Sequence, residues 1–196
     1  MVKRTVAQAA ETRESILRVA GDLFARKGYR DSTVTEIAEA AGATKGALFH
    51  HFTSKEELFT EIWRQLQLDM DVEARAAALA AIDRKDAFAA FLAGSRVYLE
   101  WASRPDYQRI VLIDGPSVLG PARWHELEFD LGRASLVAGT TFIASKGHFP
   151  MALAEPAALM LQASLNAAAY ALSLDKLGIT REQYLDTFER LLRGLR

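Results

Sequence analysis

The sequence predicts an all-α fold of about nine helices. Apolar residues recur at helical spacing along almost the whole chain, and no segment shows a convincing alternation of apolar and polar residues. All five prolines lie beyond residue 104, so no missing backbone N–H interrupts a helix in the first half. With 196 residues, half of them hydrophobic, the chain is long enough for one domain or two small ones with a real core.

The first 80 residues are predicted to hold four helices. A helix over residues 10–27 ends before Gly28, a residue suited to a C-terminal cap. Two short helices, over residues 34–41 and 44–51, flank a turn at Gly42, and a long helix follows them. One face of the first helix is apolar and consists of Ile16, Ala20, Leu23 and Phe24.

Three helix starts carry the capping-box pattern. In this pattern a hydroxyl accepts a hydrogen bond from the backbone N–H three residues later, and the side chain of that later residue reaches back. The pairs are Thr33 with Glu36, Ser54 with Glu57, and Thr180 with Gln183. They predict that helices begin next to Thr33, Ser54 and Thr180.

Proline and glycine positions divide the rest of the chain into further helices. These are expected over residues 85–103, 107–113, 122–145, 157–174 and 181–193. Asp114-Gly115-Pro116 is typical of a helix end and a turn, so we assign Asp114 no functional role.

Composition excludes several classes of function. The chain has no cysteine, which rules out disulfide scaffolds, thiol nucleophiles and cysteine-ligated metal centres. Charges interrupt residues 1–20, which therefore do not resemble a signal peptide. The uncharged stretch 157–174 approaches the length of a membrane span, but its polar side chains favour a buried interface helix. We expect a cytoplasmic protein with no cofactor and no membrane segment.

The net charge of −1 conceals an asymmetry along the chain. Residues 1–55 hold nine Lys or Arg against six Asp or Glu, whereas residues 56–196 hold fifteen against nineteen. If the partner is a polyanion, the N-terminal quarter is the part expected to bind it.

The segment most informative about function covers residues 33–55, TVTEIAEAAGATKGALFHHFTSK. Its two short helices cannot each bury much surface, so they are expected to pack on the first helix as a helix-turn-helix unit. The turn at Gly42 is expected to need a positive φ. The residues predicted to supply the packing are Ile37, Ala38, Leu48 and Phe52.

This packing leaves a polar, aromatic and small-residue face on the second short helix. The DNA major groove admits an α-helix, small side chains let its backbone approach the bases, and a lysine can donate to guanine or phosphate. Thr33 and Lys55 each lie at the start of a neighbouring helix, where they can contact backbone phosphates. The predicted DNA-binding residues are Thr33, Thr44, Lys45, Gly46, Ala47, Phe49, His50, His51 and Lys55.

The segment resembles the DNA-binding domain of the tetracycline-repressor (TetR/AcrR) family of transcriptional regulators. The similarity is carried by ETRESILRVAGDLFARKGY, TVTEIAEAAG and ALFHHFTSKEELF, which together cover about the first 60 residues. The resemblance implies a three-helix DNA-binding domain over residues 1–55 and a helical ligand-binding and dimerisation domain over residues 56–196. It also implies repression that is relieved when a small molecule binds. A looser similarity to one branch of the family covers residues 109–128.

The chain departs from the family pattern at Phe49, where the family commonly has tyrosine. Phe49 lacks the hydroxyl that would contact one phosphate. We expect this loss to weaken DNA binding without changing the sequence preference, because phosphate contacts position the protein and base contacts specify the sequence.

Two sets of residues in the second half are candidates for binding a small, apolar or amphipathic molecule. Gln162, Asn166 and Tyr170 share one helix face, where they can line a cavity, form hydrogen bonds across a dimer or face water. Aromatic side chains can wall an apolar pocket, although at helical spacing they more often form plain core. The aromatic residues considered are Tyr98, Trp101, Trp124, Phe129 and Phe142.

No metal or catalytic site is predicted. His50 and His51 are adjacent on a helix and point about 100° apart, so they cannot chelate one ion together. His125 and Glu128 share a helix face but lack the second pair that a carboxylate-bridged site needs. The sequence also contains no nucleophile–base–orienter set, so we expect no enzyme.

The last two predicted helices are expected to form a homodimer interface. The helix over residues 157–174 is apolar on nearly every face, and the last helix adds Tyr184, Leu185, Phe188, Leu191, Leu192 and Leu195. We therefore predict a homodimeric repressor that a small molecule releases from a palindromic DNA operator. The alternatives are a ligand-independent or activating DNA-binding regulator, and a helical ligand carrier or enzyme.

Overall fold

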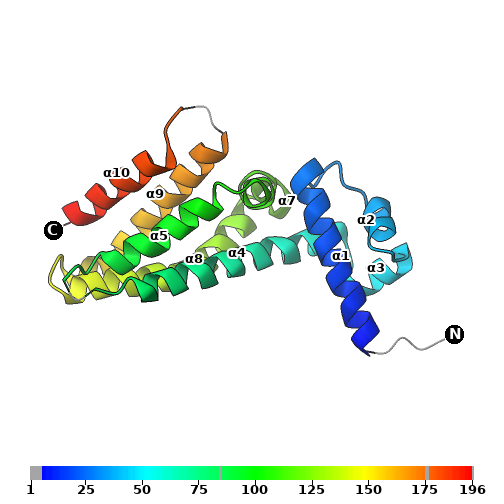
Figure 1. Cartoon of the computed structure of the whole chain (residues 1–196), viewed down its shortest axis with the longest axis horizontal. Helices are drawn as coiled ribbons and strands as arrows, with labels where there is room; N and C mark the ends of the chain where they lie inside the picture. Colours follow the sequence, from blue (N-terminus) through cyan, green and yellow to red (C-terminus); the bar gives the residue numbers. More distant parts are fainter. Residues whose placement is uncertain (1–5, 84, 175–176, 196) are drawn as a thin grey trace. The chain divides into compact units, whose positions relative to one another are not determined.

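The computed structural model describes residues 6–83, 85–174 and 177–195, apart from the side chains of residues 6, 125 and 128–130. Every regular element in these ranges is helical, which confirms the predicted fold class (Figure 1). The α-helices are α1 (Val6–Lys27), α2 (Val34–Ala40), α3 (Lys45–His51), α4 (Lys55–Ala80), α5 (Ala89–Trp101), α6 (Pro105–Tyr107), α7 (Gly115–Leu119), α8 (Pro121–Ser145), α9 (Ala154–Leu174) and α10 (Arg181–Gly194). A π-helix, η1 (Gln108–Asp114), and a 3₁₀ turn, η2 (Met151–Leu153), complete the set.

The chain divides into two compact units, which we describe separately. The first unit comprises residues 1–66 and 105–121, and the second comprises residues 67–104 and 122–196. The segment 105–121 therefore belongs with the N-terminal helices, although it lies far from them in the sequence. The assignment of DNA binding to residues 1–55 and of ligand binding and dimerisation to residues 56–196 stays a prediction.

In the first unit, α1 packs against α2 and α3 and also against α6 and η1. The apolar face predicted for the first helix is buried, as are the four packing residues of the helix-turn-helix segment. The buried residues of the two sets are Ile16, Ala20, Leu23 and Phe24, and Ile37, Ala38, Leu48 and Phe52. The two short helices thus bury their apolar sides on α1 and on each other, as their length requires.

Most of the predicted helix caps and turns are confirmed. Gly28 and Gly42 have φ of 82° and 65°, the left-handed values expected after α1 and between α2 and α3. Thr33 with Glu36 and Thr180 with Gln183 form complete capping boxes.

The third predicted capping box is only half formed. Ser54 Oγ accepts the Glu57 N–H at 3.0 Å, as predicted. The Glu57 carboxylate, however, accepts from the backbone N–H and the hydroxyl of Thr53, at 2.6 and 2.5 Å. Thr53 offers this carboxylate two donors where the backbone N–H of Ser54 would offer one.

The predicted helix over residues 107–113 is present, mostly as the π-helix η1, but the helix end and turn predicted at Asp114-Gly115-Pro116 are wrong. The segment forms α6, η1 and α7 in succession, and Gly115 has helical dihedral angles of −48° and −56°. Pro116 lies in the first turn of α7, where its missing N–H leaves no helical hydrogen bond unmade. The chain therefore continues as a helix through Asp114-Gly115-Pro116, and this accounts for part of the excess over nine helices.

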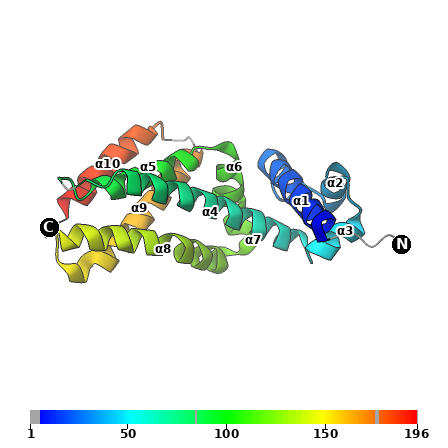
Figure 2. The same cartoon turned by 60° about the horizontal axis from the view of Figure 1, so that its bottom comes forward.

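The second unit is a bundle of long helices. Helix α10 packs against α5 and α9, and α5 packs against α9 (Figure 1). The second half of α4 and the helix α8 run in the same direction, and α5 runs opposite to them (Figure 2). Buried residues of α9 include Ala158, Leu161 and Leu165, and those of α10 include Phe188 and Leu192.

One segment of the described chain, Met151–Leu174, is long and apolar enough by length and composition to cross a membrane. Core helices of soluble proteins pass the same test. Eight residues of α9 are buried inside the protein, in agreement with the packing of α9 on α5 and α10.

Candidate nucleic-acid interface and ligand cavity

Helix α3 is positioned by its caps and by one buried anchor. Thr44 Oγ1 accepts the Ala47 N–H at 3.1 Å and so fixes the start of the helix. Leu48 is fully buried and holds the inner face. In the preceding turn, the Ala43 N–H donates to the Ala38 carbonyl at 2.9 Å, which ties α3 to α2.

The outer face of α3 is presented to solvent. Thr44, Lys45, Gly46, Phe49 and His50 are exposed. Phe49 is 50% exposed and adds an apolar ring to this otherwise polar and small-residue face. Ala47 and His51 are half-buried, and Thr33 at the start of α2 is exposed. The predicted residues of α3 therefore lie together on one short helix.

Gly46 has no packing reason to be glycine. A Cβ built on it lies no nearer than 3.9 Å to any other group, the closest being Thr44 Oγ1. Its φ is not left-handed, and glycine weakens a helix by about 1 kcal/mol relative to alanine. No packing contact within the protein therefore requires glycine at position 46.

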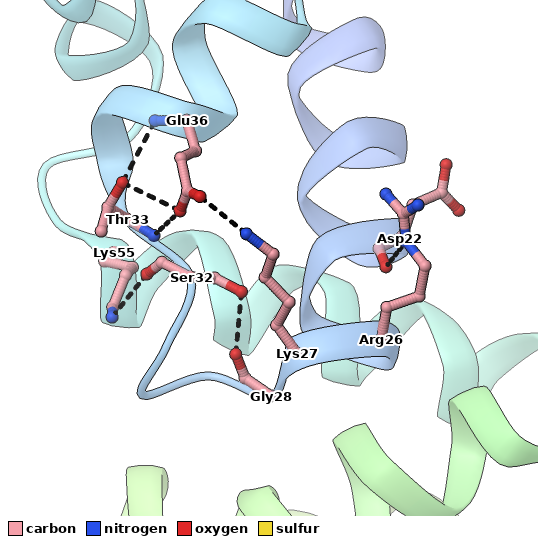
Figure 3. Close-up of polar contacts among 8 residues, drawn as sticks. All are labelled: Asp22, Arg26, Lys27, Gly28, Ser32, Thr33, Glu36 and Lys55. Carbon is pink, nitrogen blue, oxygen red and sulfur yellow. Dashed lines mark hydrogen bonds and ion pairs between the residues drawn. The ribbon is translucent and has the colours of Figure 1, made fainter.

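The loop between α1 and α2 is held by a polar network (Figure 3). The Glu36 carboxylate accepts from Lys27 Nζ at 2.7 Å and from the Thr33 N–H at 3.0 Å. The bond from Lys27, followed by those from Thr33, lowers the pKa of Glu36 from 4.5 to about 2. The buried Ser32 hydroxyl donates to the Gly28 carbonyl at 2.8 Å. The network fixes how the chain passes from α1 into the helix-turn-helix unit.

Lys55 closes the same loop from the start of α4. Its Nζ donates to the carbonyls of Tyr29 and Ser32 at 2.9 and 3.0 Å, and it lies 4.1 Å from the centre of the Tyr29 ring. Burial, and secondarily the Glu56 carboxylate, raise the pKa of Tyr29. Lys55 is therefore a structural residue of this loop, and its predicted phosphate contact stays a prediction.

Asp114 holds the other side of the loop, a role that sequence reasoning missed. Its carboxylate accepts from the Tyr29 N–H at 2.7 Å and from Arg109 Nε at 3.2 Å. The Arg109 guanidinium fills the space where a side chain on Gly28 would lie. No local signal could have found these contacts, because Tyr29 and Asp114 are 85 positions apart.

The second unit contains a cavity of about 540 Å³, within the range of small-molecule sites. Residues of α4, α5, α8 and α9 line it, and most of them are apolar. Of the predicted ligand residues, Tyr98, Gln162 and Asn166 line the cavity, and the Tyr98 hydroxyl donates to Asn166 Oδ1 at 2.9 Å. Phe142, which the sequence grouped with the aromatic candidates, lines it as well.

The other predicted ligand residues lie elsewhere. Trp101, Trp124 and Tyr170 are not among the described residues that line the cavity. Trp101 Nε1 donates to Glu73 at 2.7 Å, and the Arg104 guanidinium lies 3.8 Å from its ring centre. The side chains of Phe129, His125 and Glu128 lie outside the described part of the chain.

The sequence missed much of the cavity's polar wall. Gln67 and Asp71 are buried on α4, and Ser135 Oγ on α8 donates to the Asp71 carboxylate at 3.1 Å. A spacing of four residues between two polar side chains of an otherwise apolar helix face is the signal that could have found Gln67 and Asp71. Among the described residues, no group of three or more His, Asp or Glu is arranged to hold a metal ion.

The fold and the exposed α3 define a helix-turn-helix protein that carries a helical unit with a cavity. A protein-family model described as "Bacterial regulatory proteins, tetR family" matches residues 16–62. A second family model, "Tetracyclin repressor-like, C-terminal domain", matches residues 88–195. The chain belongs to the tetR family of bacterial regulatory proteins, since the second match alone spans more than half of it.

Individual relatives agree with this membership. The chain is 48% identical over 63 residues to the HTH-type transcriptional regulator AcrR of Shigella flexneri, a match covering 32% of this chain and 29% of that protein. It is 49% identical over 61 residues to the HTH-type transcriptional repressor BepR of Brucella suis, covering 31% and 29%. A crystal structure of a TetR-family transcriptional regulator from Pectobacterium atrosepticum is 32% identical, with a TM-score of 0.81 over 98% of this chain and 97% of that one.

Proposed function

We propose that this protein is a cytoplasmic, homodimeric transcriptional repressor that inserts α3 of each protomer into the major groove of a palindromic operator. The observation that carries the proposal is the exposed outer face of α3, with open space above Gly46 and an exposed Phe49. A helix that enters the groove needs such a face. The proposal draws further support from the matched relatives, of which the Brucella protein is named a repressor.

The residues of this face have distinct proposed tasks. Lys45 lies in the first turn of α3, the part of a recognition helix that contacts base edges, and donates to guanine or to phosphate. Gly46 and Ala47 let the backbone approach the bases. His50, His51 and Phe49 contact the groove wall, while Thr33 and Lys55 flank it at the phosphates.

Dimerisation is proposed through α9 and α10. Both helices bury one side inside the protomer and leave a second apolar side exposed. Met160 on α9 is 73% exposed and Leu191 on α10 is 57% exposed, and Tyr170 and Leu174 continue the exposed side of α9. Two such helices from each protomer can pack around a two-fold axis and cover these side chains.

Ligand control is proposed through the cavity of the second unit. A molecule that binds there with different affinity in two states of the protein shifts the balance between them. A difference of about 1 to 3 kcal/mol releases the operator by roughly 5- to 150-fold.

The proposal is tested by recovering the operator. The purified protein is incubated with fragmented genomic DNA of its host at about 0.15 M salt, and the bound fragments are sequenced. We expect one or a few palindromic sites. Recovery of fragments with no shared motif contradicts the proposed repressor.

Lys45→Ala then tests the docking of α3 on the recovered operator. We expect a loss of affinity of about 1–3 kcal/mol, or a reduction of the salt slope by about one if Lys45 contacts phosphate. Lys85→Ala removes a positive charge from an exposed residue outside α3 and is the control. If Lys45→Ala changes neither the affinity nor its salt dependence, α3 does not dock as proposed.

A further inference from the structure

The cavity of the second unit has a polar end. There, α4 meets α8 through the bond from Ser135 Oγ to Asp71, and α5 meets α9 through the bond from the Tyr98 hydroxyl to Asn166. Gln162 adds a buried amide. Because Asp71, like Gln162, is less than one-tenth exposed, we refer to this polar end as the closed end of the cavity.

The opposite end of the cavity is apolar and open. Leu79 of α4 is 70% exposed, and Ile82 and Phe142 are exposed beside it. Helices α4 and α8 run in the same direction (Figure 2), and Leu79 and Phe142 lie about two turns beyond Asp71 and Ser135 on them, so these two apolar residues lie toward the same end. With a rise of 1.5 Å per residue, Leu79 lies about 12 Å along α4 from Asp71. The lining therefore changes from one with buried polar groups to one with exposed apolar side chains over roughly the length of a medium alkyl chain.

The charges on the described lining residues compensate one another. They are the Asp71 carboxylate and the Arg75 guanidinium, which form an ion pair one helical turn apart. The other polar groups at the closed end are amides and hydroxyls, which donate and accept hydrogen bonds without carrying charge. A carboxylate placed there would meet Asp71, and an ammonium group would compete with Arg75 for the same partner.

We propose that this cavity binds an uncharged amphiphile with its polar head at the closed end and its apolar chain toward the open end. The head is a neutral group that forms hydrogen bonds, such as a hydroxyl, carbonyl or amide, and it lies against Gln162 and Asn166. The chain covers Leu79, Ile82 and Phe142. This inference rests on the proposed ligand control, but it can be tested without DNA.

The head group is tested with four probes that share a ten-carbon chain: 1-decanol, decanamide, decanoate and decylammonium. Isothermal titration calorimetry on the full chain at pH 7 gives the Kd of each. We expect decanol and decanamide to bind at least tenfold more tightly than the two charged probes. The proposal is overturned if a charged probe binds as tightly as decanol, or if none of the four binds.

The orientation is tested by comparing decanol with hexanol, whose chain does not reach Leu79. Each methylene in contact with an apolar wall strengthens binding by up to about fourfold. Leu79→Ser should therefore weaken decanol binding severalfold and leave hexanol binding unchanged. Val72→Ser is the matched control, because Val72 lies on the same helix, is 66% exposed and is not among the described lining residues. Equal weakening of both alcohols overturns the orientation.

Gln162→Met tests the head-group contact itself, since methionine keeps the length of glutamine and removes the amide. We expect about a tenfold weaker binding of decanol. An unchanged Kd in a variant with unchanged circular dichroism overturns the placement of the head.

Operator release is measured last, with decanol added to the complex of the protein and its recovered operator. Binding of decanol without release contradicts the proposed ligand control and leaves the ligand class standing. Release by decanoate and not by decanol overturns the ligand class and leaves the proposed control standing.

Discussion

At the scale of single residues, Gly46 lowers the stability of its helix and is explained by no packing contact within the protein. Its helical conformation costs the protein stability, and no group of the protein occupies the space that a side chain would fill. A residue that weakens its own helix without a packing reason is typical of a functional surface.

Gly46→Ala is therefore expected to raise the stability of the first unit by up to about 1 kcal/mol and to lower operator affinity, because in the proposed docking the new methyl group faces the DNA. Urea unfolding and a fluorescence anisotropy titration measure the two effects. Gly194→Ala, at the end of α10 with open space around it, is the control and should leave operator affinity unchanged. Unchanged operator affinity in Gly46→Ala would show that the DNA does not contact α3 at this residue.

Glu36 links the stability of the first unit to pH. Its pKa in the folded protein is about 2 against 4.5 for an ordinary glutamate, so its bonds to Lys27 and Thr33 stabilise the fold above pH 4.5. This contribution is lost progressively as the pH falls from 4.5 toward 2.

Glu36→Gln should accordingly lower the urea midpoint at pH 7 and flatten the decline of stability between pH 4.5 and 2. Unfolding midpoints measured over this range at constant ionic strength provide the test. Glu39→Gln, which removes an equal charge from the same helix, is the control. A decline of the same slope in Glu36→Gln would exclude Glu36 as its source.

At the scale of elements, local sequence patterns predicted most helices and failed at one segment. The helices around Gly28, Thr33 and Thr180 were predictable because caps and apolar periodicity act within a few residues. The continuation of η1 into α7 through Asp114 was not, because Asp114 accepts a hydrogen bond from Tyr29 in a distant part of the chain. A π-helix often marks a functional position, and here it spans Gln108–Asp114.

The candidate sites differ in the same way: a site carried by one helix was predictable, and a site built from distant helices was only partly so. The outer face of α3 was predictable, since one short helix carries it and its inner face is identified by Leu48. The cavity was only partly predictable, because four helices distant in sequence build it. Gln162 and Asn166 stood out as polar residues of an apolar helix, whereas Ser135 gave no signal apart from its partner Asp71.

Asp114→Asn tests whether the segment 105–121 supports the DNA-binding helices. It keeps the shape of the side chain but removes the charge from the bonds with Tyr29 and Arg109, and we expect a loss of about 1–3 kcal/mol in the stability of the first unit. Hydrogen exchange at the Tyr29 amide should become faster. Asp31→Asn, an exposed residue of the same loop, is the control. Protection of this amide equal to that of the unmodified protein would show that the carboxylate does not hold the loop.

At the scale of the whole molecule, the proposed repressor function depends on two copies of α3. A single seven-residue helix contacts few base pairs, so one protomer discriminates weakly between sequences. Two protomers on a palindromic site combine their contacts, which multiplies the specificity of each. The apolar sides of α9 and α10 that remain exposed in the protomer are the proposed means of joining them.

Met160→Glu and Leu191→Glu test this interface, because a charge in an apolar contact must be desolvated without a partner. We expect each variant to sediment as a monomer at concentrations where the unmodified protein is a dimer, and to lose affinity for the full palindrome more than for a half-site. Val72→Glu places the same charge on an exposed apolar residue of α4 and should keep the dimer. A monomeric Val72→Glu, or a dimeric Leu191→Glu with full operator affinity, would move the interface away from α9 and α10. The comparison of palindrome with half-site separates loss of the dimer from damage to α3, since only damage to α3 weakens binding to both DNAs equally.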